Sequence, residues 1–184
     1  EVLETIAARP TVRVAILTGA GDRAFSVGGD LYQRKSMTKE EWLRQRQVFD
    51  RVLYNLRQLR RPIFTAVNGM AYGGGCEMAI STDFIIASAD ARFGQPEVNL
   101  GLIPGYGGSQ RLPRLVGRGR ALELLLTGDM ISAARAYEIG LVNRVVPAAD
   151  LMAEARKVAA VLAGKAPVAV RYILEAVQHG AEMS

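Results

Sequence analysis

The chain has 184 residues, of which 49% are hydrophobic and 22% charged, a composition typical of a globular domain with its own core. Cys76 is the only cysteine and His179 the only histidine, so an intrachain disulfide, a histidine-based triad and a histidine-rich metal site are excluded. The net charge of +5 suits an anionic ligand. The basic residues are scattered without interleaved aromatics, which disfavours nucleic acid. No apolar run is long enough to span a membrane.

The first sixty residues predict two helices and two strands. In chain order we expect a helix at 2–8, a buried strand at 12–19, a strand with a glycine turn at 24–31, a polar mobile loop at 32–38, and a long helix at about 39–60. Thr38 and Glu41 have the spacing of a capping box at the start of the long helix. One face of that helix is apolar and is expected to lie in the core or against a partner: Phe49, Val52, Leu53, Leu56 and Leu59.

The segment 62–79 combines a buried strand, a glycine turn and a short helix. Residues 62–67 are apolar and β-branched, and Gly73 to Gly75 precede the helical sequence CEMAIS. A helix that starts after a glycine turn leaves backbone N–H groups free for an anion or a developing oxyanion. Glu77 lies in the first turn, within apolar sequence. A buried carboxylate is costly unless it is paired or used, so Glu77 is a candidate functional residue, whereas Cys76 is expected to serve packing.

The rest of the chain alternates strands and helices. We expect strands at 83–88, 92–94 and 141–146, and helices at 109–117, 118–127, 133–140 after the cap Ser132, 150–163 and 167–178. Glu97 and a glycine-rich loop, 101–108, precede the first of these helices. The alternation predicts an α/β fold.

Three long motifs carry a family resemblance. AILTGAGDRAFSVGGDL (15–31), NGMAYGGGCEMAISTDFIIAS (68–88) and FGQPEVNLGLIPGYGGSQRLPRLVG (93–117) closely resemble the enoyl-CoA hydratase (crotonase) family. The resemblance implies stacked ββα units with surrounding and C-terminal helices, and a homotrimer or a dimer of trimers. It also implies a single domain over 1–184 that lacks an N-terminal hairpin and C-terminal helices, with an active-site core in 1–140 and a helical part in 141–184.

The resemblance also assigns roles to residues of this chain. Glu77 matches the carboxylate that holds the attacking water, and Glu97 matches the one that exchanges the proton at the α-carbon. The N–H groups of Gly29 and Gly74 match the oxyanion hole, although alanine is usual at position 29. The resemblance implies that the coenzyme A part of the substrate binds to Val27, Asp30, Leu31, Tyr32 and Gly105. Many hydratases have lysine at the position of Tyr32. Neither a metal nor a separate cofactor is implied.

The leading function is therefore hydration of a 2-enoyl-CoA thioester. A Δ3,Δ2-enoyl-CoA isomerase is the nearest alternative, and Glu77 favours hydration because such isomerases often keep only the carboxylate matching Glu97. An RNA-binding member of the family is a different class, for which the arginine-rich helix 39–60 is the relevant feature; an inactive scaffold is another. A single cysteine fits a reducing compartment, so we expect the cytoplasm, or the mitochondrial matrix if a transit peptide precedes this chain.

Overall fold

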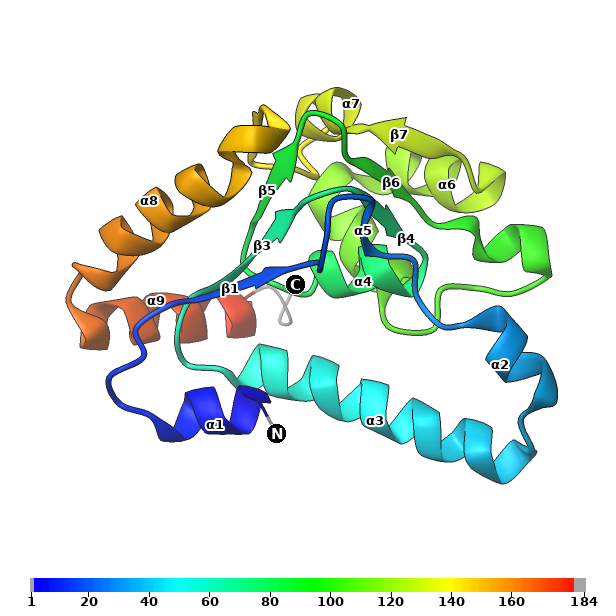
Figure 1. The fold of residues 1–184 in the computed structure, drawn as a ribbon, viewed down its shortest axis with the longest axis horizontal. Coiled ribbons are helices and arrows are strands. Elements are labelled where there is room, and N and C mark those ends of the chain that lie inside the picture. Colours follow the sequence, from blue (N-terminus) through cyan, green and yellow to red (C-terminus); the bar gives the residue numbers. More distant parts are fainter. Residues whose placement is uncertain (1, 181–184) are drawn as a thin grey trace.

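Residues 2–180 are described by a computed structural model, in which two four-stranded sheets are surrounded by helices (Figure 1). The helical elements are α1 (Val2–Ala8), α2 (Leu31–Ser36), α3 (Lys39–Gln58), α4 (Gly74–Ala79), η1 (Pro96–Leu100), α5 (Gly108–Val116), α6 (Arg118–Thr127), α7 (Ala133–Glu138), η2 (Ala148–Asp150), α8 (Leu151–Ala163) and α9 (Pro167–Gly180). The strands are β1 (Ala15–Thr18), β2 (Ala24–Ser26), β3 (Ile63–Val67), β4 (Met70–Tyr72), β5 (Ile85–Ser88), β6 (Arg92–Gly94), β7 (Met130–Ser132) and β8 (Arg144–Val146).

The first sheet is parallel throughout and has the order β1-β3-β5-β8. Every residue of β3 is buried, which explains its continuous apolar run with few polar interruptions. Successive β3 side chains face opposite sides. Phe64 and Ala66 pack against α8, whereas Val67 packs on the other side, in the large cluster that holds Phe93 and Leu112.

The second sheet has the order β2-β4-β6-β7, and only β7 runs antiparallel to its neighbour among these described strands. Each of the pairs β1–β2, β3–β4 and β5–β6 contributes its first strand to one sheet and its second strand to the other. Helices follow each pair, so the predicted ββα units are confirmed. Because β2, β4 and β6 are parallel, the segments that follow them leave the sheet at the same edge.

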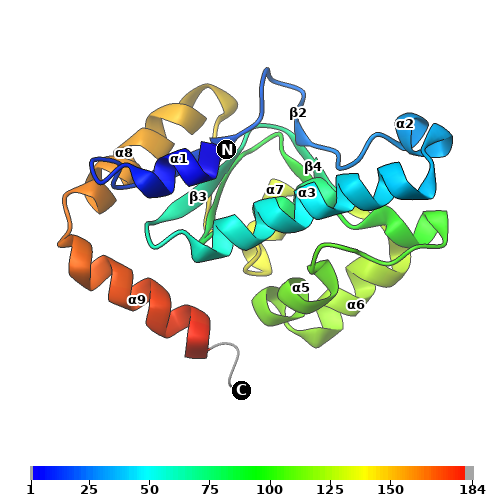
Figure 2. The same cartoon turned by 90° about the horizontal axis from the view of Figure 1, so that it is seen from below.

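Helix α3 runs across one side of the sheets, and in this view α9 and the α5–α6 pair both lie below it, α9 on the left and α5–α6 on the right (Figure 2). The predicted capping box is present: the Thr38 side chain accepts from the Glu41 N–H, and Glu41 accepts from the Thr38 N–H. Leu53, Leu56 and Leu59 are buried against Ile63 and α1, so this stripe belongs to the chain's own core.

Several boundaries differ from the sequence prediction. The segment 32–38 was expected to be a mobile loop, but Leu31–Ser36 is helical, because the Asp30 carboxylate caps its first N–H groups. The strand at 12–19 is shorter, Ala15–Thr18. Strands β4 and β7 were missed, because three-residue strands bounded by glycine or a helix cap carry too little periodicity. The Ser132 cap is confirmed. Within residues 2–180, no helix has the length and apolarity needed to cross a bilayer.

Candidate active site

The candidate site is built on the segments that follow β2, β4 and β6. Gly29 lies just after β2, Gly74 and Glu77 follow β4 on helix α4, and Glu97 follows β6 on η1. Since the carboxyl ends of parallel strands meet at one edge, residues about 20 and 50 positions apart in the chain come together there. The sequence prediction that Glu77 and Glu97 converge is supported by geometry, because Glu97 Oε1 lies next to Gly73, whose carbonyl accepts from the Glu77 N–H.

Close contacts with neighbouring segments explain why residues 73–75 are glycines. Gly73 has φ +53°, in the left-handed region, and a Cβ on it would stand 3.1 Å from Glu97 Oε1. A Cβ on Gly75 would overlap the carbonyl group of Ser26, so α4 reaches β2 only because this residue has no side chain. Helix α4 is thereby held against both neighbouring segments, and the backbone of Gly74 lies between them.

Glu77 is fixed in a buried position. Only 1% of Glu77 is exposed to solvent. The Oε1 atom accepts hydrogen bonds from the N–H groups of Tyr106 at 2.8 Å and Gly108 at 2.7 Å. Burial raises the pKa of the Glu77 carboxyl, while the two N–H donors and the Arg111 guanidinium lower it in part. The carboxylate is therefore oriented by one oxygen, and the other oxygen is left for a ligand.

Glu97 has a different environment. It is half-buried, and its Oε2 atom is buried without a hydrogen bond to any described residue. Burial raises the pKa of the Glu97 carboxyl, its own backbone N–H lowers it, and the charge of Glu77 raises it again. A buried polar atom without a protein partner is costly, which indicates a group that a ligand satisfies. Burial thus raises the pKa of both carboxyl groups, and Glu77 differs from Glu97 in having two N–H donors from the loop before α5 and the Arg111 guanidinium near it.

The two predicted oxyanion-hole segments lie in contact. Gly28 has φ +83°, and a Cβ on it would stand 3.1 Å from the backbone nitrogen of Gly74. The loop that carries Gly29 thus covers the start of α4, where N–H groups are not used within the helix. That Gly29 and Gly74 donate to a common oxygen remains a prediction.

The residues predicted to bind coenzyme A lie along an open edge of this region. Val27, Leu31 and Tyr32 are 56%, 47% and 86% exposed. Asp30 instead accepts hydrogen bonds from the N–H groups of Tyr32 and Gln33, so its carboxylate caps α2. Gly105 lies in the loop before α5, next to Tyr106. Their contact with coenzyme A remains a prediction.

Sequence reasoning missed residues that hold this site together. Tyr106 and Arg111 were not singled out, because a tyrosine between glycines and an arginine in a helix carry no local signal of function. Arg34 was assigned to a mobile loop, yet its guanidinium is hydrogen-bonded to the Tyr106 hydroxyl. Gln95 is 1% exposed, and neither of its side-chain polar atoms has a hydrogen bond to a described residue. Burial raises the pKa of Cys76 to about 12, which fits the predicted packing role.

Comparisons with known proteins agree with this geometry. The Enoyl-CoA hydratase/isomerase family model matches residues 1–184. The chain is 47% identical to a short-chain-enoyl-CoA hydratase of Clostridium acetobutylicum, over 92% of this chain and 65% of that protein. It is 44% identical to a crotonyl-CoA hydratase of Syntrophomonas wolfei, over 93% of this chain and 66% of that protein. The chain thus spans about two thirds of the length of these curated relatives.

A solved structure extends the similarity to the whole fold. The crystal structure of an enoyl-CoA hydratase from Bacillus anthracis superposes with a TM-score of 0.95 at 43% identity, and the match covers 98% of this chain and 70% of that one. With the family model matching the full length of the chain, and relatives of this identity, the chain belongs to the enoyl-CoA hydratase/isomerase family.

Proposed function

We propose that the protein adds water across the double bond of short-chain 2-enoyl-CoA thioesters. The observation that carries this proposal is the pair Glu77 and Glu97, in which Glu77 Oε1 accepts two backbone N–H groups whereas Glu97 Oε2 is buried without a hydrogen bond to a described residue. Hydration requires one ionised carboxylate to take a proton from water and one carboxylic acid to give a proton to carbon. The relatives named for short-chain and crotonyl substrates support the acyl length.

The reaction follows from the roles of four groups. Glu77, oriented by the N–H groups of Tyr106 and Gly108, holds a water molecule with its free oxygen. The water oxygen bonds to C3 of the enoyl group as its proton passes to Glu77. Glu97 gives its proton to C2, and the C2–C3 double bond becomes single. Proton transfer from Glu77 back to Glu97 restores the starting state, and the product is a 3-hydroxyacyl-CoA.

Negative charge collects on the thioester oxygen as water attacks. The N–H groups of Gly29 and Gly74 are proposed to donate to this oxygen, and donors that are fixed before the reaction stabilise the transition state more than the ground state. Val27, Asp30, Leu31, Tyr32 and Gly105 are proposed to line the coenzyme A path along the open edge.

The direct test uses crotonyl-CoA and the purified full-length protein. We expect loss of the absorbance of the conjugated thioester, with 3-hydroxybutyryl-CoA identified by mass spectrometry. A 3-enoyl-CoA substrate tests the isomerase alternative in parallel. A folded protein that isomerises the 3-enoyl thioester but leaves crotonyl-CoA unchanged would contradict the proposal.

We also propose that the protein assembles as a trimer or a dimer of trimers. The stripe on α3 is buried within the chain, so it does not support assembly. On α6, Leu122 and Leu126 are 37% and 68% exposed on one outward face, and paired exposed leucines are typical of a contact surface. Light scattering of the full-length protein at micromolar concentration should give three or six subunits, and a monomer alone would contradict this proposal.

A further inference from the structure

Tyr106 is held in place from several directions at the candidate site. Its N–H donates to Glu77, and its carbonyl oxygen accepts from the Arg111 guanidinium at 2.7 Å. Its ring stacks on that of Phe49 in α3, with centroids 5.1 Å apart and planes 24° apart. The Tyr106 ring is therefore a fixed part of the site wall, and its position is tied directly to that of Glu77.

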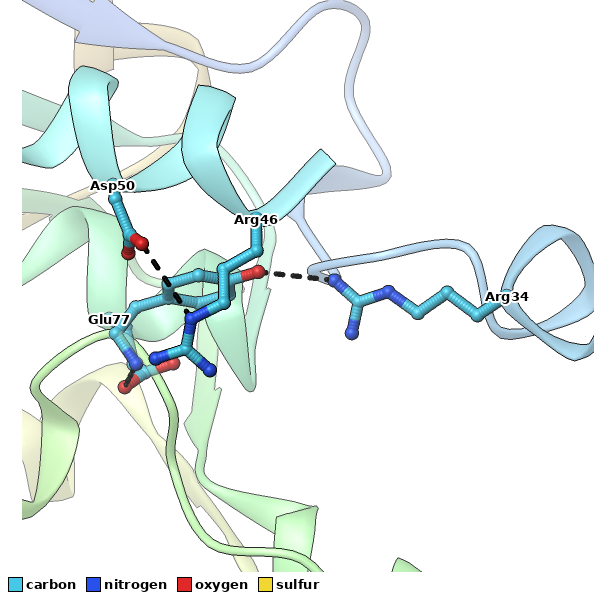
Figure 3. A network of polar contacts seen from close by, with 5 residues as sticks. Arg34, Arg46, Asp50 and Glu77 are labelled. Atoms are coloured by element: carbon cyan, nitrogen blue, oxygen red, sulfur yellow. Dashed lines mark hydrogen bonds and ion pairs between the residues drawn. The ribbon is translucent and has the colours of Figure 1, made fainter. Parts of the chain in front are cut away.

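Arg34 connects this ring to helix α2. Its Nη2 donates to the Tyr106 hydroxyl at 3.3 Å, and its Nε donates to Gln45 Oε1 in α3 at 3.2 Å. Figure 3 shows the Arg34 side chain reaching inward from α2 to this hydrogen bond. We call Arg34, Gln45, Phe49 and Tyr106 the Arg34–Tyr106 bridge. Gln45 and the Tyr106 hydroxyl are both neutral, so hydrogen bonding and packing hold the guanidinium there.

The bridge lies directly on the two candidate oxyanion-hole residues. The Arg34 guanidinium occupies the space that a Cβ on Gly29 would need, with Nε 2.7 Å from that point. The Tyr106 ring comes within 3.6 Å of the point where a Cβ on Gly74 would stand. Glycine at position 29 therefore leaves the space that the Arg34 guanidinium occupies in this position.

The positions of the two carboxylates indicate which carbons of a bound substrate would lie next to the Arg34–Tyr106 bridge. Glu97 lies over Gly73 and would face C2, whereas Glu77 would face C3. The Tyr106 backbone is hydrogen-bonded to Glu77 and its ring lies next to Gly74, so on the proposed function carbons beyond C3 would extend toward the Tyr106 ring and the Arg34 guanidinium. A long alkyl chain there would have to break the guanidinium's hydrogen bonds and desolvate its charge, which is costly.

We propose that the Arg34–Tyr106 bridge closes the acyl end of the site and thereby restricts the protein to short acyl groups. This inference rests on the proposed hydratase function. It assigns the choice of chain length to Arg34, Tyr106 and the missing side chain at Gly29.

The test compares kcat/KM for crotonyl-CoA and 2-octenoyl-CoA in the full-length protein. In Arg34→Ala we expect the crotonyl/octenoyl ratio to fall at least about tenfold, the lower range for discrimination by one methylene in a pocket. Gly29→Ala keeps the backbone N–H but displaces the guanidinium, a flexible chain end that can move, so it should lower the ratio similarly. The double variant Arg34→Ala/Gly29→Ala should lower the ratio little further than either single variant, because both changes remove the same contact.

Controls separate this inference from the function on which it rests. Arg135→Ala removes an exposed arginine paired with Glu138 on α7 and should leave the ratio unchanged; circular dichroism checks folding throughout. Unchanged ratios in both Arg34→Ala and Gly29→Ala, with crotonyl-CoA hydrated normally, would overturn the inference alone. An unmodified protein that does not hydrate crotonyl-CoA would overturn the proposed function. Preference for carboxylate-ended acyl groups that Arg34→Ala abolishes would show charge recognition instead, and would also overturn the inference.

Discussion

The surroundings of Glu77 and Glu97 differ although the two residues share one site. Glu77 is almost completely buried on a helix, and one of its oxygens accepts two backbone N–H groups. Glu97 lies on the short η1 turn, half-buried, with an oxygen that has no described partner. Burial raises the pKa of both carboxyl groups; two N–H donors and the Arg111 guanidinium lower it in part at Glu77, whereas at Glu97 its own backbone N–H lowers it and the charge of Glu77 raises it.

This difference teaches how one residue type can serve as both base and acid. The carboxyl group that receives fixed donors is stabilised in its ionised form, and the group beside that charge is stabilised in its protonated form. In the proposed reaction, the backbone N–H groups of Tyr106 and Gly108 would therefore act by stabilising the ionised form of Glu77.

The largest effect on activity is expected when the charge of one of the two carboxyl groups is removed. Glu77→Gln and Glu97→Gln should each lower hydration of crotonyl-CoA by at least about 100-fold, the lower range for a general acid or base. Steady-state kinetics with active-site concentration measured by ligand titration checks this. A variant that keeps unmodified turnover would show that its carboxylate is structural.

The oxyanion hole is tested by removing a donor. Gly29→Pro eliminates the N–H in a loop, and we expect turnover to fall roughly 10²–10³-fold, the range for one such donor. Binding of free coenzyme A, measured by calorimetry, should change much less. Gly29→Ala changes the same position but retains the N–H, so its turnover of crotonyl-CoA should fall much less than that of Gly29→Pro. Near-normal turnover in a folded Gly29→Pro variant would show that another group donates to the thioester oxygen.

The pH dependence sharpens the assignment of base and acid. Hydration needs Glu77 ionised and Glu97 protonated, so the rate should fall at low pH as Glu77 gains a proton and at high pH as Glu97 loses one. Arg111→Gln removes a positive charge that lowers the pKa of Glu77. The acidic limb of the kcat/KM profile should therefore move to higher pH, by less than about one unit for an interaction of this kind. A shift to lower pH would contradict the assignment.

The smallest expected effect is on stability. The pKa of Glu77 is raised in the folded state, so the folded chain holds this proton more tightly than the unfolded chain. Stability therefore falls as pH rises from the unfolded value through the folded value. Glu77→Gln removes this penalty and should raise Tm at pH 8, by about 2–4 °C per kcal/mol gained. The increase in Tm should become smaller toward pH 4.5. A Tm of Glu77→Gln below that of the unmodified protein at both pH values would contradict this prediction.

Much of the fold was predictable because its signals are local. The apolar run of β3, the Thr38–Glu41 capping box and the Ser132 cap each fix an element within a few residues. Helix α2 was not recognised, since its stability depends on the Asp30 cap and on Arg34 reaching Tyr106, 72 positions away in the chain. Strand β4 has three residues and is defined by its neighbours.

The candidate site was predictable to a similar degree. Glu77 and Glu97 follow recognisable glycine and proline motifs, and the family resemblance supplied their roles. The donors to Glu77 were not predictable, because they are backbone groups of Tyr106 and Gly108, whose position depends on how the loop before α5 folds back. A pattern of side chains in the sequence does not indicate the direction in which a backbone N–H points.

The division of each strand pair between two sheets has a consequence for how such a chain can change over evolution. The site receives Gly29 from the first pair, Gly74 and Glu77 from the second, and Glu97 from the third. The first sheet joins these units, and each of these proposed catalytic residues follows a strand of the second sheet. A mutation after one strand can therefore alter a single reaction step while the others persist, so such a scaffold can acquire a related reaction by exchanging one position at a time.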